Sequence, residues 1–147
     1  MNLAEKFNDK RSAQLFMRKF TVFLIDDSME DTELTMRTLQ HCKYISEVFP
    51  FRKAEMALQA LAITDRSEDA DVPVVFLDMN MPGMSGLDFI RRIREEKNIN
   101  EIPIAILTGT TDLPEIKESI RLGVKYFIQK PIEEEDIEKI AHEFGFN

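Results

Sequence analysis

The chain has 147 residues, of which 44% are hydrophobic and 31% charged, as is usual for one soluble globular domain. Its 27 acidic residues outnumber its 19 Lys and Arg, and the net charge of −8 argues against surfaces for nucleic acid or anionic membrane, which need clustered cations. A single cysteine, Cys42, cannot form an internal disulfide, and neither a signal-peptide pattern nor an apolar run of about 18 residues is present. We therefore expect a cytoplasmic protein.

Short apolar runs alternate along the chain with segments of helical length. The runs are rich in β-branched or aromatic residues and predict strands at 21–25, 47–51, 74–77, 102–107 and 125–128. Helices are expected at 29–42, 54–62, 86–97, 113–122 and 137–144. Apolar residues at i, i+3, i+4 and i+7 mark one face of segment 54–62 most clearly.

This β-α alternation predicts a parallel sheet with helices on both faces. The strands are nearly all apolar, as expected for a sheet covered on both sides. Pro50 lies inside the second strand, which is therefore expected at an edge of the sheet.

Residues 1–20 precede the first strand and form a separate N-terminal extension. Their apolar residues Ala13, Phe16, Met17 and Phe20 have helical spacing, so the extension is either a further helix or a frayed tail. Residues 21–147 are expected to form the domain.

Polar side chains of distinct chemistry follow four of the five predicted strands. The first strand ends at Asp26–Asp27, the third at Asp78, the fourth at Thr108 and the fifth at Lys130–Pro131. Ligands of open α/β sheets bind outside the carboxyl ends of the strands, near the point where the strand order reverses. If the first and third strands are neighbours there, these side chains converge on one crevice.

Three carboxylates in one crevice repel each other unless a cation lies among them. Mg²⁺ suits Asp26, Asp27 and Asp78, because it prefers a few carboxylates together with waters and phosphate oxygens. Lys130 adds a compact positive charge, and Thr108 adds a hydroxyl donor. A metal, a lysine and a hydroxyl around one carboxylate suit phosphoryl transfer, with the carboxylate as nucleophile and an aspartyl phosphate as product.

Each of these residues also has a structural interpretation. Asp26–Asp27 followed by Ser28 is typical of a helix cap, Asp78 alone could cap a turn, and Lys130 could be a solvated charge. Their occurrence together at four strand ends favours the shared site.

The motifs FLIDDS, FLDMNMPGMSG, AILTGT and FIQKP occur in this order and resemble the receiver domain of two-component response regulators. The resemblance runs from about Thr21 to Phe144. It implies a flavodoxin-like, doubly wound five-stranded parallel sheet of order 2-1-3-4-5.

The resemblance also implies a role for each site residue. Asp78 would accept the phosphoryl group, and Asp26 and Asp27 would hold Mg²⁺ with the backbone carbonyl of Asn80. Thr108 would hydrogen-bond the phosphoryl oxygen and Lys130 would pair with it. The Lys130–Pro131 peptide would be cis.

The family further implies a switch, in which Thr108 is coupled to an aromatic residue three positions before the lysine, here Phe127. Phosphorylation would then alter the surface of the fourth helix, fifth strand and fifth helix, to which an output partner binds. The donor would be a histidine kinase or a histidine phosphotransfer protein, and the chain would act as a stand-alone signalling module rather than an enzyme.

Two other functions also use this type of sheet and site. A Mg²⁺-dependent phosphatase with an aspartyl-phosphate intermediate typically has a second acid two residues after the nucleophile, where this chain has Asn80. A nucleotide or flavin binder of flavodoxin type needs a phosphate-binding loop after the first strand, where the sequence IDDSMED is acidic. Both are weaker interpretations than the receiver domain.

Overall fold

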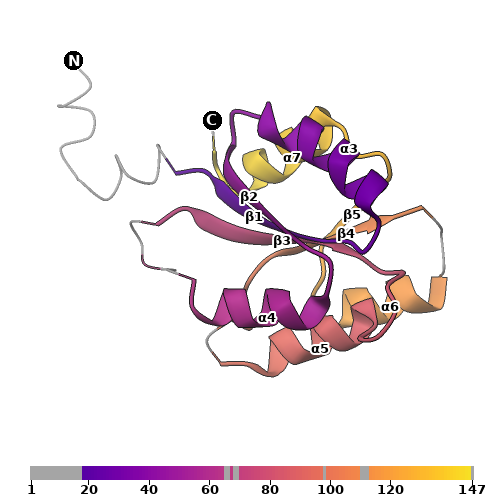
Figure 1. Cartoon of the computed structure of the whole chain (residues 1–147). Helices are drawn as coiled ribbons and strands as arrows, with labels where there is room; N and C mark the ends of the chain where they lie inside the picture. The colour runs from indigo at the N-terminus through magenta and orange to yellow at the C-terminus, as the bar shows by residue number, and fades with distance from the viewer. Residues whose placement is uncertain (1–17, 65–66, 68–69, 98, 110–112, 147) are drawn as a thin grey trace, which may run out of the picture.

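The computed structural model describes residues 18–146, apart from 65–66, 68–69, 98 and 110–112 (Figure 1). The helix considered for the N-terminal extension falls on residues 1–17 and so lies outside the described residues. Five strands alternate with five helices in the part that is described. They are β1 (Phe20–Ile25), α3 (Met29–Gln40), β2 (Ile45–Phe51), α4 (Ala54–Ala62), β3 (Val72–Asp78), α5 (Gly86–Glu95), β4 (Ile104–Thr108), α6 (Leu113–Arg121), β5 (Tyr126–Gln129) and α7 (Glu134–Glu143).

The strands form one parallel sheet in the order β2-β1-β3-β4-β5. This confirms the doubly wound fold, and β2 lies at an edge as Pro50 predicted. Because all strands run in the same direction, their carboxyl ends lie along one edge of the sheet. The residues that follow the strands are therefore brought together, although they are far apart in sequence.

Helices cover both faces of the sheet (Figure 1). Helices α3 and α7 pack on one face over a core that contains Leu24, Leu39, Phe76 and Ile140. Helices α4, α5 and α6 lie on the other face, where Leu61, Leu77, Phe89 and Ile106 are buried. Burial of both sheet faces explains why the strands are almost wholly apolar.

All five strands and α7 begin one to three residues away from the predicted positions, and the differences at β4 and α7 have a clear physical cause. The fourth strand starts at Ile104 and not at 102, because Pro103 has no N–H to donate to the sheet. Helix α7 starts at Glu134, before the apolar residue at 137 that marked its expected start. Glu133 and Asp136 form a capping box that adds this first turn.

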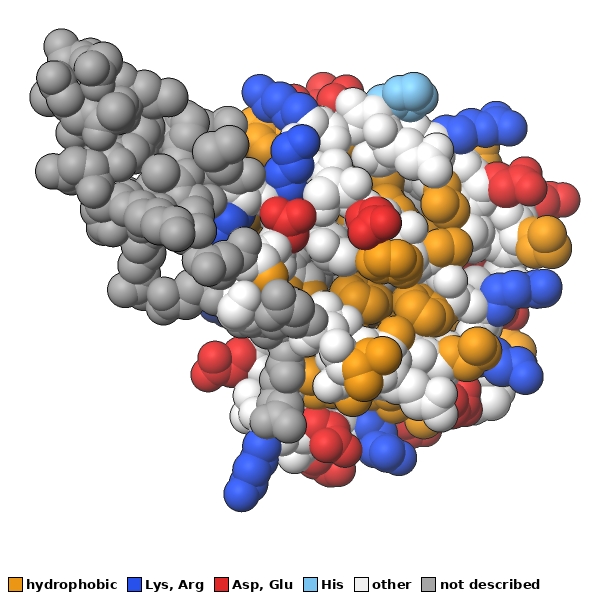
Figure 2. Space-filling view, turned by 60° about the vertical axis from the view of Figure 1, so that its left-hand side comes forward, with side chains coloured by type: hydrophobic (Ala, Val, Ile, Leu, Met, Phe, Trp, Pro, Cys, Tyr) orange, Lys and Arg blue, Asp and Glu red, His pale blue; other side chains and the backbone are white. Residues whose placement is uncertain are grey.

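Several hydrophobic side chains remain on the surface. Leu34 on α3, Phe49 on β2 and Met56 on α4 are all exposed. Figure 2 shows hydrophobic side chains gathered in the middle of one face, with acidic and basic side chains around them. Phe49 also contacts the core, since its ring lies 5.8 Å from that of Phe23.

Candidate functional site

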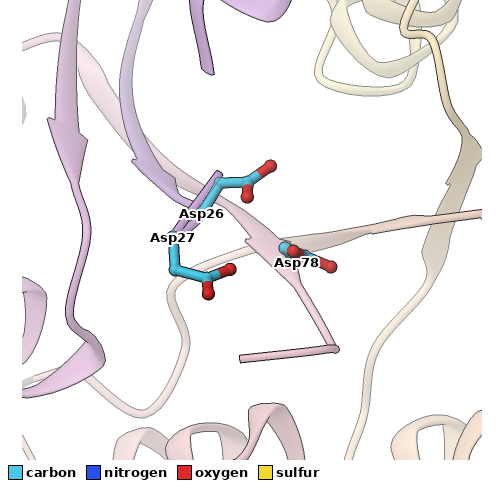
Figure 3. A group of neighbouring side chains, drawn as sticks. All are labelled: Asp26, Asp27 and Asp78. Atoms are coloured by element: carbon cyan, nitrogen blue, oxygen red, sulfur yellow. The ribbon is translucent and has the colours of Figure 1, made fainter. Parts of the chain in front are cut away.

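The acidic residues predicted for the site lie at adjacent strand ends. β1 and β3 are neighbouring strands, and Ile25 of β1 pairs with Leu77 of β3. Asp26 and Asp78 are the next residues in the sequence after this pair, so they lie at adjacent positions. Oxygen atoms of Asp26, Asp27 and Asp78 all lie within 4.8 Å of one another. Figure 3 shows the three carboxylates projecting to the same side of the strand ends.

Asp26 and Asp78 are buried, with only 1% and 7% of their surface exposed, whereas Asp27 is half-buried. The backbone N–H of Ser28 donates to Oδ1 of Asp26 at 2.9 Å, and that of Asn80 donates to Oδ1 of Asp78 at 3.1 Å. Each buried carboxylate is therefore oriented by the loop that follows it. Ser28 also caps α3, accepting from the N–H of Asp31, so the capping role and the site role coexist here.

The loop after Asp78 separates the strand from the next helix. Gly83 adopts a φ of 82°, in the left-handed region that favours glycine, and α5 begins only at Gly86 after the cap Ser85. An added Cβ at Gly86 would lie 3.0 Å from Cα of Met79. The start of α5 thus packs closely against the residue next to Asp78.

Lys130 connects the acids of the site. Its Nζ lies 3.0 Å from Oδ2 of Asp26 and 2.9 Å from Oδ2 of Asp31, but 3.6 Å from Oδ2 of Asp78. Asp31, in the first turn of α3, was missed by the sequence analysis. Its spacing from Asp27, four residues on, was a usable signal, because it places Asp31 at the amino end of the helix that begins beside the acidic pair.

Burial and neighbouring charges shift the pKa values of the two central groups. Burial raises the pKa of Asp78, and the charge of Asp26 adds to this, against the opposing effects of the Asn80 N–H and Lys130. Burial alone would lower the pKa of Lys130. The hydrogen bonds to Asp31 and Asp26 outweigh burial, so the Lys130 pKa lies above its ordinary value.

Thr108, Phe127 and Lys130 lie on β4 and β5 or directly after them, and Asn80 lies after β3. Thr108 is the last residue of β4, and its carbonyl oxygen accepts from the N–H of Lys130 at 3.0 Å. The Lys130–Pro131 peptide is cis. Phe127 is half-buried and packs against the core on the α4–α6 side of the sheet. Asn80 is exposed in the loop after β3.

The three carboxylates fit a hard divalent cation. Mg²⁺ binds oxygen at about 2.1 Å, so opposite ligands of an octahedron are about 4.2 Å apart. This is close to the 4.8 Å within which the three carboxylate oxygens lie. Burial is the main cause of the raised pKa of Asp78, and repulsion from the nearby charge of Asp26 adds to it. A bound cation would relieve that repulsion.

Comparison with known proteins decides the family. The family model described as "Response regulator receiver domain" matches residues 22–142. The chain belongs to the response regulator receiver family. Among curated receiver-containing relatives, two-component response regulators ARR7 and ARR16 of Arabidopsis thaliana are 30% and 29% identical to it. The matches cover 81% of this chain but 59% of ARR7 and 76% of ARR16.

Solved receiver structures have the same fold. The bacteriophytochrome response regulator AtBRR superposes with a TM-score of 0.71 at 27% identity, over 88% of this chain and 95% of that one. The chemotaxis protein CheY4 of Vibrio cholerae gives 0.70 at 25% identity, over 86% and 98%. This chain is thus a receiver domain of two-component type. Within the described residues of the receiver domain, none of the helices combines the length and apolarity needed to cross a membrane.

Proposed function

We propose that this receiver accepts a phosphoryl group on Asp78 from a phosphohistidine of a histidine kinase or histidine phosphotransfer protein. The observation that carries the proposal is the convergence of Asp26, Asp27, Asp78 and Lys130 at the carboxyl edge of the sheet. Residues 21–147 would form the functional unit, with residues 1–20 as an extension.

The reaction joins an oxygen of the Asp78 carboxylate to phosphorus, while the P–N bond of the phosphohistidine breaks. The bonding electrons pass to the imidazole nitrogen, which takes a proton from solvent. Asp78 is suited to this role because its carboxylate is fixed by the Asn80 N–H and lies at the end of a buried strand.

The other site residues prepare the acceptor for a negatively charged group. Asp26, Asp27 and Asp78, with the backbone of Asn80, would hold Mg²⁺, which when bound supplies positive charge to the phosphoryl oxygens. Lys130 lies 3.6 Å from Asp78 and is near enough to pair with a phosphoryl oxygen. Thr108, at the end of β4, would donate its hydroxyl to another.

Signalling would follow from the added charge. Thr108 would turn toward the phosphoryl group and Phe127 would repack, so that the surface of α6, β5 and α7 changes for an output partner, or the group would pass onward in a phosphorelay. In this account the protein is an acceptor in the cytoplasm and not an enzyme acting on other substrates. The phosphatase alternative is disfavoured because Asn80 has no carboxyl group to act as general acid.

The proposal is tested with acetyl phosphate and Mg²⁺, by intact-protein mass spectrometry. Wild type and the control variant Asp88→Asn, which changes an exposed acid of α5, should each gain one phosphoryl group. Asp78→Asn should gain none, and EDTA should prevent the gain in wild type. If wild type gains no phosphoryl group, or if Asp78→Asn is modified as fast as wild type, the proposal is wrong.

A further inference from the structure

The second strand also ends in charged residues, and both are cations. Strand β2 ends at Phe51 and α4 begins at Ala54, so Arg52 and Lys53 form the whole connection between them. The carbonyl oxygen of Phe51 accepts a hydrogen bond from the N–H of Asp26 at 3.0 Å. The connection is therefore fixed directly beside the acidic pair.

Arg52 and Lys53 line an open depression of about 840 Å³. Its other walls come from the acidic pair, the first turns of α4 and the loop after β3; they are Asp27, Glu55, Met56, Pro82 and Gly83. Because Asp27 belongs both to this depression and to the acidic cluster, the depression opens onto the site. A molecule that enters through this depression therefore passes beside the two cations.

Both cations are available to such a molecule. Arg52 and Lys53 are exposed, and neither forms an ion pair within the residues that the structure describes. By contrast, Arg91, Arg121 and Lys130 each pair with a carboxylate. Arg52 and Lys53 differ from other unpaired cations of the described residues, such as Arg92 and Lys97, in lying beside the acidic site.

Phosphoryl donors are anions at neutral pH, and the crevice repels them. Four carboxylates surround one lysine there, those of Asp26, Asp27, Asp31 and Asp78. Exposed charges act over about 8 Å at physiological ionic strength, so cations at the entrance reduce the repulsion during approach. Charge-lined clefts can raise association rates by about tenfold or more.

We propose that Arg52 and Lys53 form an entry site that captures the phosphoryl anion of the donor. This inference rests on the proposed phosphorylation of Asp78 and adds a capture step before it. The two residues take no part in making or breaking the bonds to phosphorus. The ligand class is a doubly charged phosphoryl group, carried by an acyl phosphate or by phosphohistidine.

The test compares two double variants that remove the same charge. Arg52→Gln/Lys53→Gln alters the entry site. Arg92→Gln/Lys97→Gln is the control, because both residues are exposed and Lys97 lies near Val72 and Pro73, at the opposite edge of the sheet. Phosphorylation by acetyl phosphate in Mg²⁺ is followed by intact mass at low and high salt.

We expect the entry-site variant to react about three- to tenfold more slowly than the control at ~0.02 M ionic strength. The difference should fall below about twofold at ~0.5 M salt, where screening is strong. The entry-site variant should need a higher donor concentration than the control to reach its half-maximal rate, while the maximal rates of the two variants should be equal. A variant with retained charge, Arg52→Lys/Lys53→Arg, should react like wild type.

Mg²⁺ affinity, measured by calorimetry, separates capture from structural damage. Removing two cations beside the acids should tighten Mg²⁺ binding while it slows the reaction with the donor. Damage to the fold would instead weaken Mg²⁺ binding and slow the reaction with the donor together. N-phosphoimidazole, a small analogue of phosphohistidine, shows whether capture extends beyond acyl phosphates; an effect with acetyl phosphate alone supports an entry site for acyl phosphates.

Equal rates for the two double variants, or a difference that salt does not change, would overturn the entry site while leaving phosphorylation of Asp78 intact. Weaker Mg²⁺ binding in the entry-site variant would also overturn it. A wild-type protein that takes no phosphoryl group from either donor would instead overturn the proposed function, and the entry site with it.

Discussion

Lys130 joins acids from two different elements, Asp26 at the end of β1 and Asp31 on α3. The Asp26 side chain has no exposed surface, so its charge depends on Lys130 and on the N–H of Ser28 for compensation. A buried carboxylate that loses its cation remains desolvated and has no opposite charge to compensate it fully. The lysine is therefore important for stability as well as for the proposed phosphoryl site.

We expect Lys130→Met to lower the free energy of unfolding by about 2–3 kcal/mol in EDTA. Mg²⁺ should reduce this loss, because a bound cation supplies the missing positive charge. Lys139→Met, which changes an exposed lysine of α7, should alter stability by less than about 0.5 kcal/mol. Urea unfolding of wild type, Lys130→Met and Lys139→Met measures these differences. Equal losses of stability in the two variants would contradict the stabilising role of Lys130.

Asp78 should make stability depend on pH. Its folded-state pKa lies above the ordinary value of 3.8, so between these two values the folded protein holds a proton that the unfolded chain has lost. Stability therefore falls as pH rises through this range, and the penalty is complete above the raised pKa.

Asp78→Asn removes that penalty. In EDTA, the variant should have a higher free energy of unfolding than wild type at pH 7. The gain should shrink as pH is lowered through the raised pKa and vanish below the ordinary one. Chemical unfolding at a series of pH values measures this difference, and a gain that grows toward low pH would show that the sign is wrong.

At the scale of elements, the start of α5 and the loop after β3 support each other. A Cβ on Gly86 would lie 2.5 Å from Sδ of Met79 and 3.0 Å from its Cα. The thioether can move aside, but the Cα belongs to the backbone that follows Asp78. A larger residue at Gly86 would therefore displace the acceptor loop.

Gly86→Ala should cost about 1–3 kcal/mol of stability, as overpacking usually does, and should slow phosphorylation of Asp78. Gly109→Ala is the matched control, because its Cβ would meet no atom of the described structure within 4 Å. Thermal unfolding and the acetyl phosphate reaction measure both effects. Full stability and rate in Gly86→Ala would show that this contact does not position the loop.

Strands β4 and β5 connect the acidic cluster to the surface proposed for output. Thr108 ends β4 and bonds through its carbonyl to Lys130, while Phe127 lies on β5 opposite Ile106. A change at the Thr108 hydroxyl can thus reach β5 through neighbouring strands. Phe127 has no hydroxyl, so the proposed switch acts through packing alone.

Thr108→Ala should still accept a phosphoryl group but should lose at least half of the resulting amide chemical-shift change in α6, β5 and α7. NMR spectra with and without acetyl phosphate and Mg²⁺ measure this, with Thr38→Ala on α3 as control. If phosphorylation shifts these amides equally in wild type and Thr108→Ala, the hydroxyl does not couple the site to that surface.

At the scale of the whole molecule, parallel topology explains what the sequence could predict. Asp26, Asp78, Thr108 and Lys130 each lie at or directly after the end of an apolar strand, and parallel strands bring such positions to one edge. Asp31 could not be found in this way, since it lies on a helix and joins the site through its hydrogen bond with the side chain of Lys130. The start of α7 was misplaced because its first turn is acidic and has no apolar residue.

The entrance formed by Arg52 and Lys53 was missed for a different reason. Both residues follow a strand, as the acids do, but the sequence alone predicts no role for them. Their importance depends on the depression that they share with Asp27, which the sequence does not show. The whole molecule thus combines an acidic site, net negative charge and a cationic entrance.

The central claim is that Asp78 carries the phosphoryl group. It is tested most directly by phosphorylating the protein with acetyl phosphate and Mg²⁺, reducing it with borohydride and sequencing its peptides by mass spectrometry. Borohydride converts an aspartyl phosphate to homoserine and so marks the acceptor. We predict homoserine at position 78 and aspartate retained at 26 and 27. Homoserine at another acid with Asp78 intact would contradict the account.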